Sequence, residues 1–226
     1  MKLKATLIAA ATLAVGVISS QAQVYSQNIV GYINVNLTNG FNFVANKLDL
    51  DGTGTNNTIQ SVIGTNFPTT TTKVLAWDPV SQTYKSVTLL ANGWSSGTAG
   101  AYVKNALQPG GGVFISVAAP TNFTMVGQLI PQGTNQTVYP SQFQIVSYPW
   151  PVSGYLTTNL NYAPNAPIGT SFDTVLQWNP NTQTFVTHKK LASTWQAGSP
   201  NLGVTEPFFL LPNQTTTWTN GFAYPQ

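Results

Sequence analysis

The sequence VLAWDPVSQTY at positions 74–84 recurs as VLQWNPNTQTF at positions 175–185. Both copies place a tryptophan, an Asp or Asn, a proline and a Gln-Thr-aromatic sequence at the same spacing. Asp and Asn side chains cap their own backbone and proline fixes φ, so the middle of each copy predicts a tight turn. Each copy is therefore predicted to be a β-hairpin whose two aromatic residues belong to a hydrophobic core.

The similarity between the two regions extends beyond the hairpin. Superposing Leu75 on Leu176, a shift of about 101 residues, also aligns Trp94 with Trp195. Two further pairs of segments match: 41–48 (FNFVANKL) with 143–150 (FQIVSYPW), and 112–117 (GVFISV) with 206–211 (EPFFLL). A repeat of this length has the size of a small domain, so it predicts an internal duplication.

The composition favours an all-β fold, because Thr, Val and aromatic residues are abundant relative to strong helix formers. Ile33, Val35 and Leu37 alternate with asparagines, which is the pattern of a half-buried strand. We therefore predict two tandem β-sandwich-like domains, the first over residues 23–131 and the second over residues 132–226.

A short motif recurs at the start, middle and end of the chain, as VGYI (30–33), VGQL (126–129) and NGFA (220–223). These copies predict a strand that ends one repeated unit and begins the next. One copy, at a terminus of the chain, would then have no strand to pair with. An unmatched strand presents an open edge to other chains. Residues 24–37 are predicted either to fold back onto their own domain, which tethering favours, or to add to the sheet of a second copy.

The first residues have the pattern of a signal peptide. Lys2 and Lys4 precede an apolar run over 5–18, and the small-residue cleavage site lies at 20–22. The apolar run is shorter than the roughly 20 residues that span a bilayer. We therefore expect a signal peptide over residues 1–22, export to the periplasm, cell surface or medium, and no membrane span after cleavage.

Charge and cysteine content exclude several classes of function. The eight basic residues are all lysines and face five acidic residues; without the two leader lysines the balance is six to five. Nucleic-acid binding is not expected, because arginine is absent and the lysines are scattered. With no cysteine in the sequence, an exported chain of this kind must be stabilised by burial instead of disulfides.

The sequence GWSSG (93–97) matches the G-x-S-x-G motif of serine hydrolases, and Asp173 and His188 follow Ser95 in the order of an α/β-hydrolase triad. That motif requires a helix after the serine, whereas TAGAYVKN (98–105) lies among segments of β character. We therefore predict a loop serine, a surface-facing histidine and no catalytic residue.

The sequence DLDGTGTNNTIQ (49–60) partly matches a calcium-binding loop. Oxygen-bearing residues occupy its odd positions, and glycine occupies the sixth. The twelfth position is Gln60 instead of the usual glutamate. The segment predicts either a calcium site or a Gly-Asn-rich turn, and the sequence indicates no other cofactor. The calcium ligands would be Asp49, Asp51, Thr53, Thr55 and Asn57.

The chain has six tryptophans, which could line a carbohydrate-binding face. Four of them occur in both copies and are more simply core residues. Trp150 and Trp218 lack such counterparts, so we predict that they are exposed and that they are the candidate ligands for a polysaccharide.

The segments VYSQNIVGYINVNL, GFNFVANKLDLDGTGTNNTI, VLAWDP, GGGVFISV and TTTWTNGF together resemble a family. They are similar to the uncharacterised exported two-copy β-proteins of verrucomicrobial and planctomycete bacteria. The resemblance covers the mature chain and implies export and a duplicated β-fold, and no catalytic residue is carried over with it.

These observations predict an exported, non-enzymatic structural, adhesive or assembly protein of the cell surface or extracellular matrix. A secreted carbohydrate-binding protein is the alternative, and a hydrolase is the third possibility.

Overall fold

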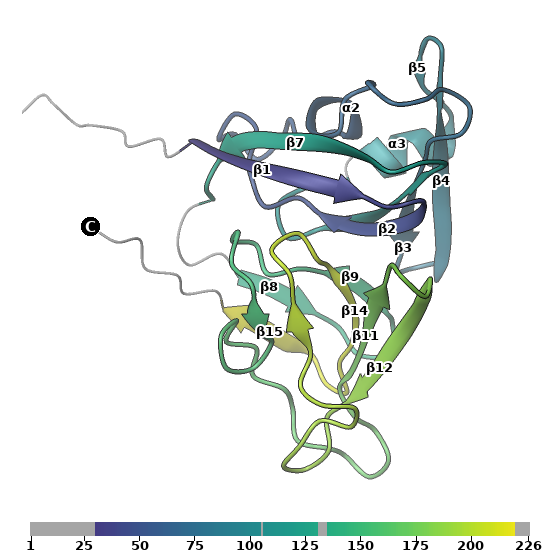
Figure 1. The fold of residues 1–226 in the computed structure, drawn as a ribbon. Coiled ribbons are helices and arrows are strands. Elements are labelled where there is room, and N and C mark those ends of the chain that lie inside the picture. Colours follow the sequence, from purple (N-terminus) through teal and green to yellow (C-terminus); the bar gives the residue numbers. More distant parts are fainter. Residues whose placement is uncertain (1–29, 105, 131–134, 220–226) are drawn as a thin grey trace, which may run out of the picture.

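The computed structural model describes residues 30–104, 106–130 and 135–219. We call residues 30–130 the first half and residues 135–219 the second half; Figure 1 shows the first half above the second. The predicted signal peptide, residues 24–29 and the NGFA motif lie outside the described residues. In the described ranges, no helix is long and apolar enough to cross a membrane.

The first half contains a five-stranded antiparallel sheet and a separate two-stranded ribbon. The sheet has the order β2-β6-β3-β4-β5, and the ribbon pairs β1 with β7 over eight residues. The elements of this half are β1 (Val30–Leu37), β2 (Gly40–Ala45), α2 (Ile59–Val62), β3 (Lys73–Asp78), β4 (Thr83–Leu90), β5 (Gly93–Trp94), α3 (Thr98–Lys104), β6 (Gly112–Val117) and β7 (Thr121–Gln128).

The second half contains a four-stranded antiparallel sheet of order β9-β14-β11-β12, a β8–β15 ribbon and a short β10–β13 pair. Its elements are β8 (Asn135–Val138), β9 (Gln144–Val146), β10 (Gly154–Tyr155), β11 (Thr174–Asn179), β12 (Thr184–Lys189), β13 (Asn201–Leu202), β14 (Phe208–Leu211) and β15 (Thr216–Thr219). The prediction of an all-β protein is therefore confirmed, with two short helices in the described chain.

The strand registers of the two halves correspond. Leu75 of β3 lies opposite Phe114 of β6, and Leu176 of β11 lies opposite Phe209 of β14. The sequence alignment of 112–117 with 206–211 is therefore wrong by one residue at these strands. The pairing of each strand with its neighbour makes Phe114 equivalent to Phe209. The loops before β6 and β14 differ in sequence, so the sequence alone could not give this alignment.

Each central sheet is covered on both faces. In β3, Val74 and Ala76 face the core of the first half, which the β1–β7 ribbon and the two helices complete. Leu75 and Trp77 point to the opposite face, as the two-residue period of a strand requires. The strands are thus covered on both faces instead of being half-buried, because the second face packs against the other half of the molecule.

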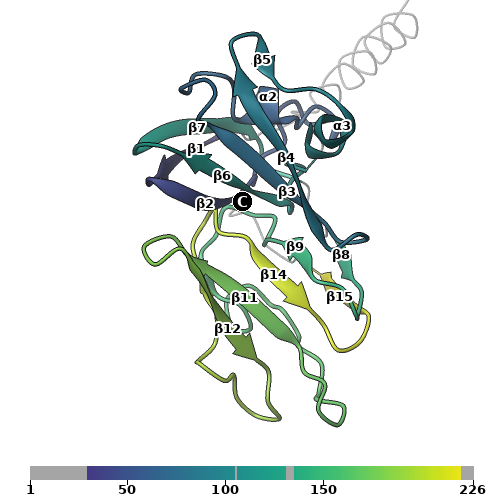
Figure 2. The ribbon, with the colours of Figure 1, turned by 90° about the vertical axis from the view of Figure 1, so that its right-hand side faces the viewer.

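A shared aromatic cluster joins the two central sheets, and Figure 2 shows these sheets lying one above the other. We call this set of residues the interface cluster. Its buried centre stacks Phe43 on Phe114, with ring centroids 4.2 Å apart, and Phe43 on Phe209 at 5.5 Å. The molecule is therefore built in four layers, with ribbons outside and sheets inside. The cluster comprises Phe43, Leu75, Trp77, Phe114, Phe143, Ile145, Leu176, Trp178, Phe185 and Phe209.

Both predicted hairpins are confirmed. Asp78 pairs with Thr83 and Asn179 pairs with Thr184, which leaves four-residue loops. The Asp78 carboxylate accepts the Val80 N–H at 3.0 Å, and the Asn179 side chain accepts the equivalent N–H at 3.0 Å. The local turn chemistry is therefore the one that the repeated sequence predicts.

The described part of the segment 24–37 folds back onto its own half, which is the first of the two alternatives predicted for it. β1 pairs with β7 over its whole length, and β15 pairs with β8, so each half closes its own ribbon. Buried Asn42 holds the turn after β1, because its side chain accepts the Thr38 N–H at 2.8 Å and donates to the carbonyl oxygens of Thr38 and Gly40. This turn fixes β1 against its own half.

Candidate functional site

The first repeated hairpin clamps an edge strand of the second half. The Trp77 indole Nε1 donates to the Phe143 carbonyl oxygen at 2.7 Å. The Gln82 side-chain amide forms two hydrogen bonds with the same residue, one from its Nε2 to the carbonyl oxygen and one from the Phe143 N–H to its Oε1, both at 3.2 Å. The glutamine thus pairs with the backbone of the residue preceding β9, as a neighbouring strand would.

The second hairpin forms the reciprocal clamp on the first half. The Trp178 Nε1 donates to the Phe41 carbonyl oxygen at 3.1 Å, and the Gln183 amide bonds the Phe41 carbonyl oxygen and N–H at 3.0 and 2.8 Å. Trp77 packs edge-on against Phe209 at 5.2 Å, and Trp178 against Phe114 at 5.1 Å. Such reciprocity is the arrangement of an isologous interface.

The repeated tryptophans therefore have a different role from the one predicted. Trp77 and Trp178 are partly buried residues between the halves, whereas a position in the core of each half was expected. Trp94 and Trp195 are also partly buried, and each packs against the core of its own half. A repeated aromatic residue indicates that the residue is buried. The sequence does not indicate that Trp77 and Trp178 pack against the opposite half of the molecule.

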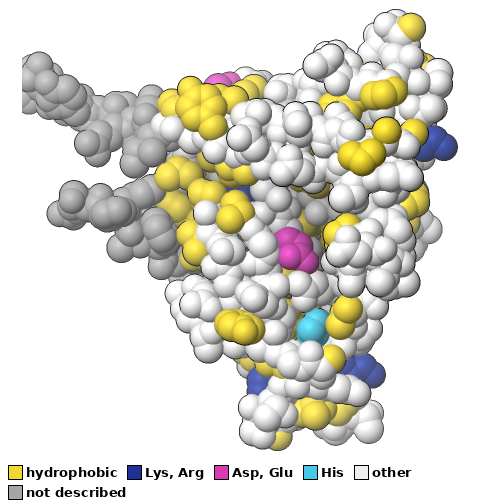
Figure 3. Space-filling view, viewed as in Figure 1, with side chains coloured by type: hydrophobic (Ala, Val, Ile, Leu, Met, Phe, Trp, Pro, Cys, Tyr) yellow, Lys and Arg dark blue, Asp and Glu magenta, His cyan; other side chains and the backbone are white. Residues whose placement is uncertain are grey.

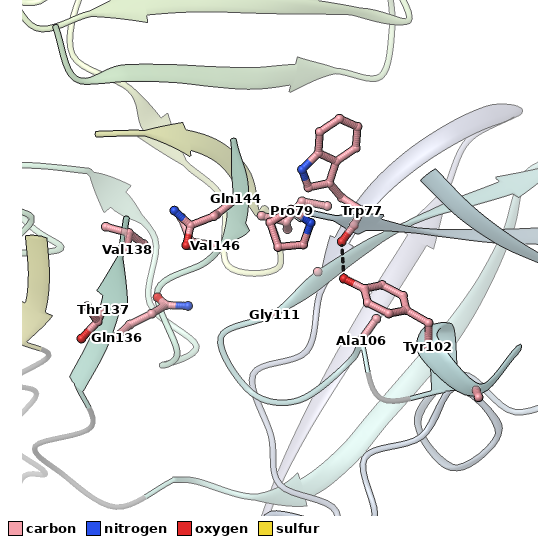
Figure 4. A pocket seen from close by; sticks show the side chains of 13 residues that line it. Trp77, Pro79, Tyr102, Ala106, Gly111, Gln136, Thr137, Val138, Gln144 and Val146 are labelled. Atoms are coloured by element: carbon pink, nitrogen blue, oxygen red, sulfur yellow. Dashed lines mark hydrogen bonds between the residues drawn. The ribbon is translucent and has the colours of Figure 1, made fainter. Parts of the chain in front are cut away.

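A groove of about 440 Å³ lies beside the first hairpin, where the first half meets β8 and β9. Figure 4 shows the Tyr102 ring on one side and the amides of Gln136 and Gln144 on the other. The Tyr102 hydroxyl donates to the Trp77 carbonyl oxygen at 2.8 Å, and the indole itself extends away from Tyr102. We call this cavity the first groove, and its walls carry aromatic, amide and hydroxyl groups without a charged side chain.

A smaller groove of about 250 Å³ occupies the corresponding place beside the second hairpin. Trp178 and Pro180 line it, as Trp77 and Pro79 line the first groove. Its wall includes Glu206, so this second groove contains an acidic group that the first lacks. The two grooves are therefore alike in position and different in chemistry.

A buried lysine lies between the halves. Lys47 is 1% exposed, and its Nζ donates to the Tyr148 carbonyl oxygen of the second half at 2.5 Å. Burial lowers the Lys47 pKa from 10.5 to about 7, although the nearby Glu206 carboxylate opposes the shift. Burial also raises the pKa of Glu206, which accepts hydrogen bonds from the Gly203 N–H and the Gln177 amide. The hydrogen bond from Lys47 to Tyr148 joins the halves, at an energetic cost in desolvation of the lysine.

The prediction that Trp150 and Trp218 are exposed is wrong. Their exposed fractions are 0% and 1%, and both belong to the core of the second half. The Trp218 Nε1 donates to the Leu160 carbonyl oxygen at 2.8 Å, and its ring packs against Tyr148 and Tyr162. A ring enclosed in this way has no face for a sugar, so these residues are structural.

The predicted calcium loop is held by its own hydrogen bonds. The Asp49 carboxylate accepts the Gly54 N–H at 2.8 Å and the Asn57 amide at 3.0 Å. The Asp51 carboxylate accepts the Thr53 N–H and hydroxyl at 3.0 and 2.7 Å, and it also accepts the Asn56 amide. The oxygens that calcium would need are thus bonded to donors. The Thr55 hydroxyl lies 2.8 Å from that of Thr53. These residues fit the predicted turn better than a metal site.

The triad residues are not brought together, and two details of their prediction are wrong. Helix α3 does follow the GWSSG segment, and His188 is buried, with Nδ1 donating to the Gly198 carbonyl oxygen at 2.8 Å. The Ser95 hydroxyl accepts the Thr88 N–H. Asp173 is fully buried and accepts a hydrogen bond from the Tyr162 hydroxyl. No hydrogen bond joins any two of the three residues, all of which are described. Each has a separate structural partner.

Sequence reasoning missed Gln82, Gln183 and Lys47. The two glutamines were visible in the repeated hairpins, but a loop glutamine is usually a solvated residue. Lys47 lies two residues after the apolar end of β2, and this closeness is the one local sign that the segment is buried. Their roles depend on the other half of the molecule.

Comparison of the chain with protein-family models, with curated proteins and with solved structures gave no match.

Proposed function

We propose that the protein is an exported, non-enzymatic structural, adhesive or assembly protein of the cell surface or extracellular matrix. We also propose that its halves are two β-sandwich-like domains derived by duplication. The matching strand order and the reciprocal Trp and Gln contacts support both statements. The reciprocal clamp is the observation that carries the proposal, because it fastens two sheets into one rigid body whose repeated residues serve the architecture.

The use of the acidic side chains also supports a structural role. Asp173 accepts hydrogen bonds from the Tyr162 hydroxyl at 2.9 Å and from the N–H groups of Asn165 and Asn213 at 2.8 Å. Glu206 holds the turn at Gly203, while Asp49, Asp51 and Asp78 hold their own loops. Carboxylates bonded in this way stabilise loops and interfaces, and this differs from the free carboxylate pair of a glycosidase.

The experiment combines localisation of the native protein with sedimentation of the purified mature chain over a range of concentrations. We expect the protein in the envelope or matrix fraction, and assemblies that grow with concentration in the absence of ligand. A chain that stays monomeric at every concentration, or esterase turnover that is lost in Ser95→Ala, would contradict the proposal.

A secreted carbohydrate-binding protein is the second candidate. The first groove favours it, because Tyr102 provides a ring while Gln136 and Gln144 provide amides in a neutral cavity of ligand size. Glycan-array binding should be lost in Tyr102→Ala and Gln144→Ala and retained in Tyr155→Ala, which removes an exposed ring elsewhere. Absence of glycan binding by the wild type would remove this candidate.

A further inference from the structure

The outer edge of β1 is open at the start of the strand; farther along, Val35 and Asn36 line the second groove with Trp178 and Pro180. β7 is the only strand that pairs with β1 among the described residues, so alternate backbone N–H and C=O groups along Val30–Leu37 face away from the ribbon. The strand contains neither a charged residue nor a proline. An edge with these properties is a template for pairing with another strand.

The other long edges are protected. The Gln183 amide occupies the edge of β2 at Phe41. Lys85 lies in the part of β4 that the two-residue strand β5 leaves uncovered, and Lys189 lies in the edge strand β12. A lysine at a strand edge discourages pairing. The far side of the ribbon is engaged at its end, because Asp49 and Gln128 exchange two backbone hydrogen bonds. The open edge of β1 therefore differs from these edges, because it has no clamping glutamine, no lysine and no backbone bridge.

The solvent-facing side chains near the start of β1 are apolar. Tyr32 is 73% exposed, Val30 is 52% exposed, and Val126, the register partner of Tyr32 on β7, is 42% exposed. Figure 3 shows hydrophobic side chains gathered at this end of the first half and few charges on the same face. An aromatic ring and two valines beside an open edge form an apolar patch on an otherwise polar surface.

We propose that β1 pairs antiparallel with β1 of a second copy of this chain, with Tyr32 opposite Tyr32 of that copy. The pairing would join two ribbons into one four-stranded sheet. Residues directly opposite each other in an antiparallel pair lie on the same face of the sheet. With Tyr32 opposite Tyr32, the solvent-exposed faces of the two ribbons would therefore lie on one face of the joined sheet. This inference rests on the proposed function, since it names the surface through which the protein assembles.

A second copy is the occupant that the chemistry of the edge favours. Two identical edges without charge meet without repulsion, whereas a charged partner strand would find no opposite charge on β1. The contact is isologous, so Tyr32 of each copy covers the ring of the other, and aromatic cross-strand pairs are among the more stabilising ones. The turn held by Asn42 makes this edge pairing preferable to an exchange of β1 between chains.

The first test uses the absence of cysteine from the chain. In this register, Tyr32→Cys places two thiols directly opposite each other, at a spacing that a disulfide can bridge. The control Asn36→Cys changes an exposed residue on the same face of the same strand, four residues from the symmetry axis. Under mild oxidation we expect a disulfide-linked dimer from Tyr32→Cys and monomer from Asn36→Cys. Equal cross-linking of the two variants would overturn the proposed register.

The second test measures the association itself. Tyr32→Lys places two lysines opposite each other and should raise the dimer dissociation constant about tenfold in sedimentation equilibrium. Val80→Lys makes a similar change at an exposed valine in the loop of the first hairpin, away from β1, and should leave the constant nearly unchanged. If the wild type assembles and Tyr32→Lys assembles equally well, this surface is wrong while the assembly function stands. If the wild type never assembles, both proposals fail.

Discussion

The two halves have similar residues in the hairpins through which they contact each other, and different residues in much of their hydrophobic cores. The residues that match between them, such as Trp77 with Trp178 and Gln82 with Gln183, form the contact between the halves. The cores diverge: aliphatic side chains dominate the first, whereas Tyr148, Trp150, Tyr162, Phe208 and Trp218 fill much of the second. A reciprocal contact constrains both partners at once, while a core needs only the correct volume. Trp94 and Trp195 also match, but each packs against the core of its own half. The repeated hairpins, and not the whole repeat, therefore mark the interface.

The largest expected effect tests the divergent cores. Trp218→Ala should lower the free energy of unfolding by about 3–5 kcal/mol, because it leaves a large cavity and removes the hydrogen bond to Leu160. Chemical denaturation measures the change. Thr217→Ala, at the exposed neighbouring position, is the control and should change stability by less than about 0.5 kcal/mol. A Trp218→Ala protein as stable as the wild type would contradict the burial of this ring.

Two equivalent positions of the halves hold different buried polar side chains. At the shift of 101 residues, Asp173 aligns with Thr72, and both are fully buried. Asp173 receives hydrogen bonds from several groups, whereas the Thr72 hydroxyl donates only to the Pro68 carbonyl oxygen. Asp173→Asn should therefore cost about 1.5–3 kcal/mol and Thr72→Val about 1 kcal/mol. Equal costs in denaturant unfolding would mean that the two buried sites are energetically equivalent.

The pH dependence tests the contact at Lys47. The Lys47 pKa is about 7 in the folded chain and near 10.5 in the unfolded chain. Between these values, unfolding takes up a proton, so stability should rise with pH by about 1 kcal/mol per pH unit. Urea unfolding at pH 7.5 and 9 should show this rise in the wild type and lose it in Lys47→Met.

The control for this prediction is Lys85→Met, which removes a partly exposed lysine near Asp78 and should retain the pH dependence of the wild type. Parallel pH profiles for the wild type and Lys47→Met would show that Lys47 keeps its proton in the folded protein.

The smallest expected effect compares the two clamps. Gln82→Ala should lower stability by about 1 kcal/mol, and Gln183→Ala by about 0.5 kcal/mol, because the hydrogen bonds of Gln82 are less exposed to water. Thermal unfolding of both variants and of Gln60→Ala, an exposed control in α2, measures the difference. A larger loss for Gln183→Ala would reverse this ranking of the clamps.

Much of the fold was predictable and most of the interface was not. The turn at Asp78 and the alternation in β3 are local properties, so they could be identified in the sequence. A turn was one of the two predictions for residues 49–60, because its glycines and asparagines also act locally. Trp218 and His188 were placed at the surface, although both are buried, because their covering residues are distant in sequence.

By itself, the sequence determined the hairpins, the all-β class and the segments that resemble one another. These features depend on backbone preference and on a two-residue period, which act within a few residues. Only the tertiary structure decided that the second face of each sheet is covered by the other half, and that Gln82 and Gln183 clamp distant edge strands. Alternation shows that a strand has two different faces, but the packing partner of each face is set by contacts between segments far apart in the chain.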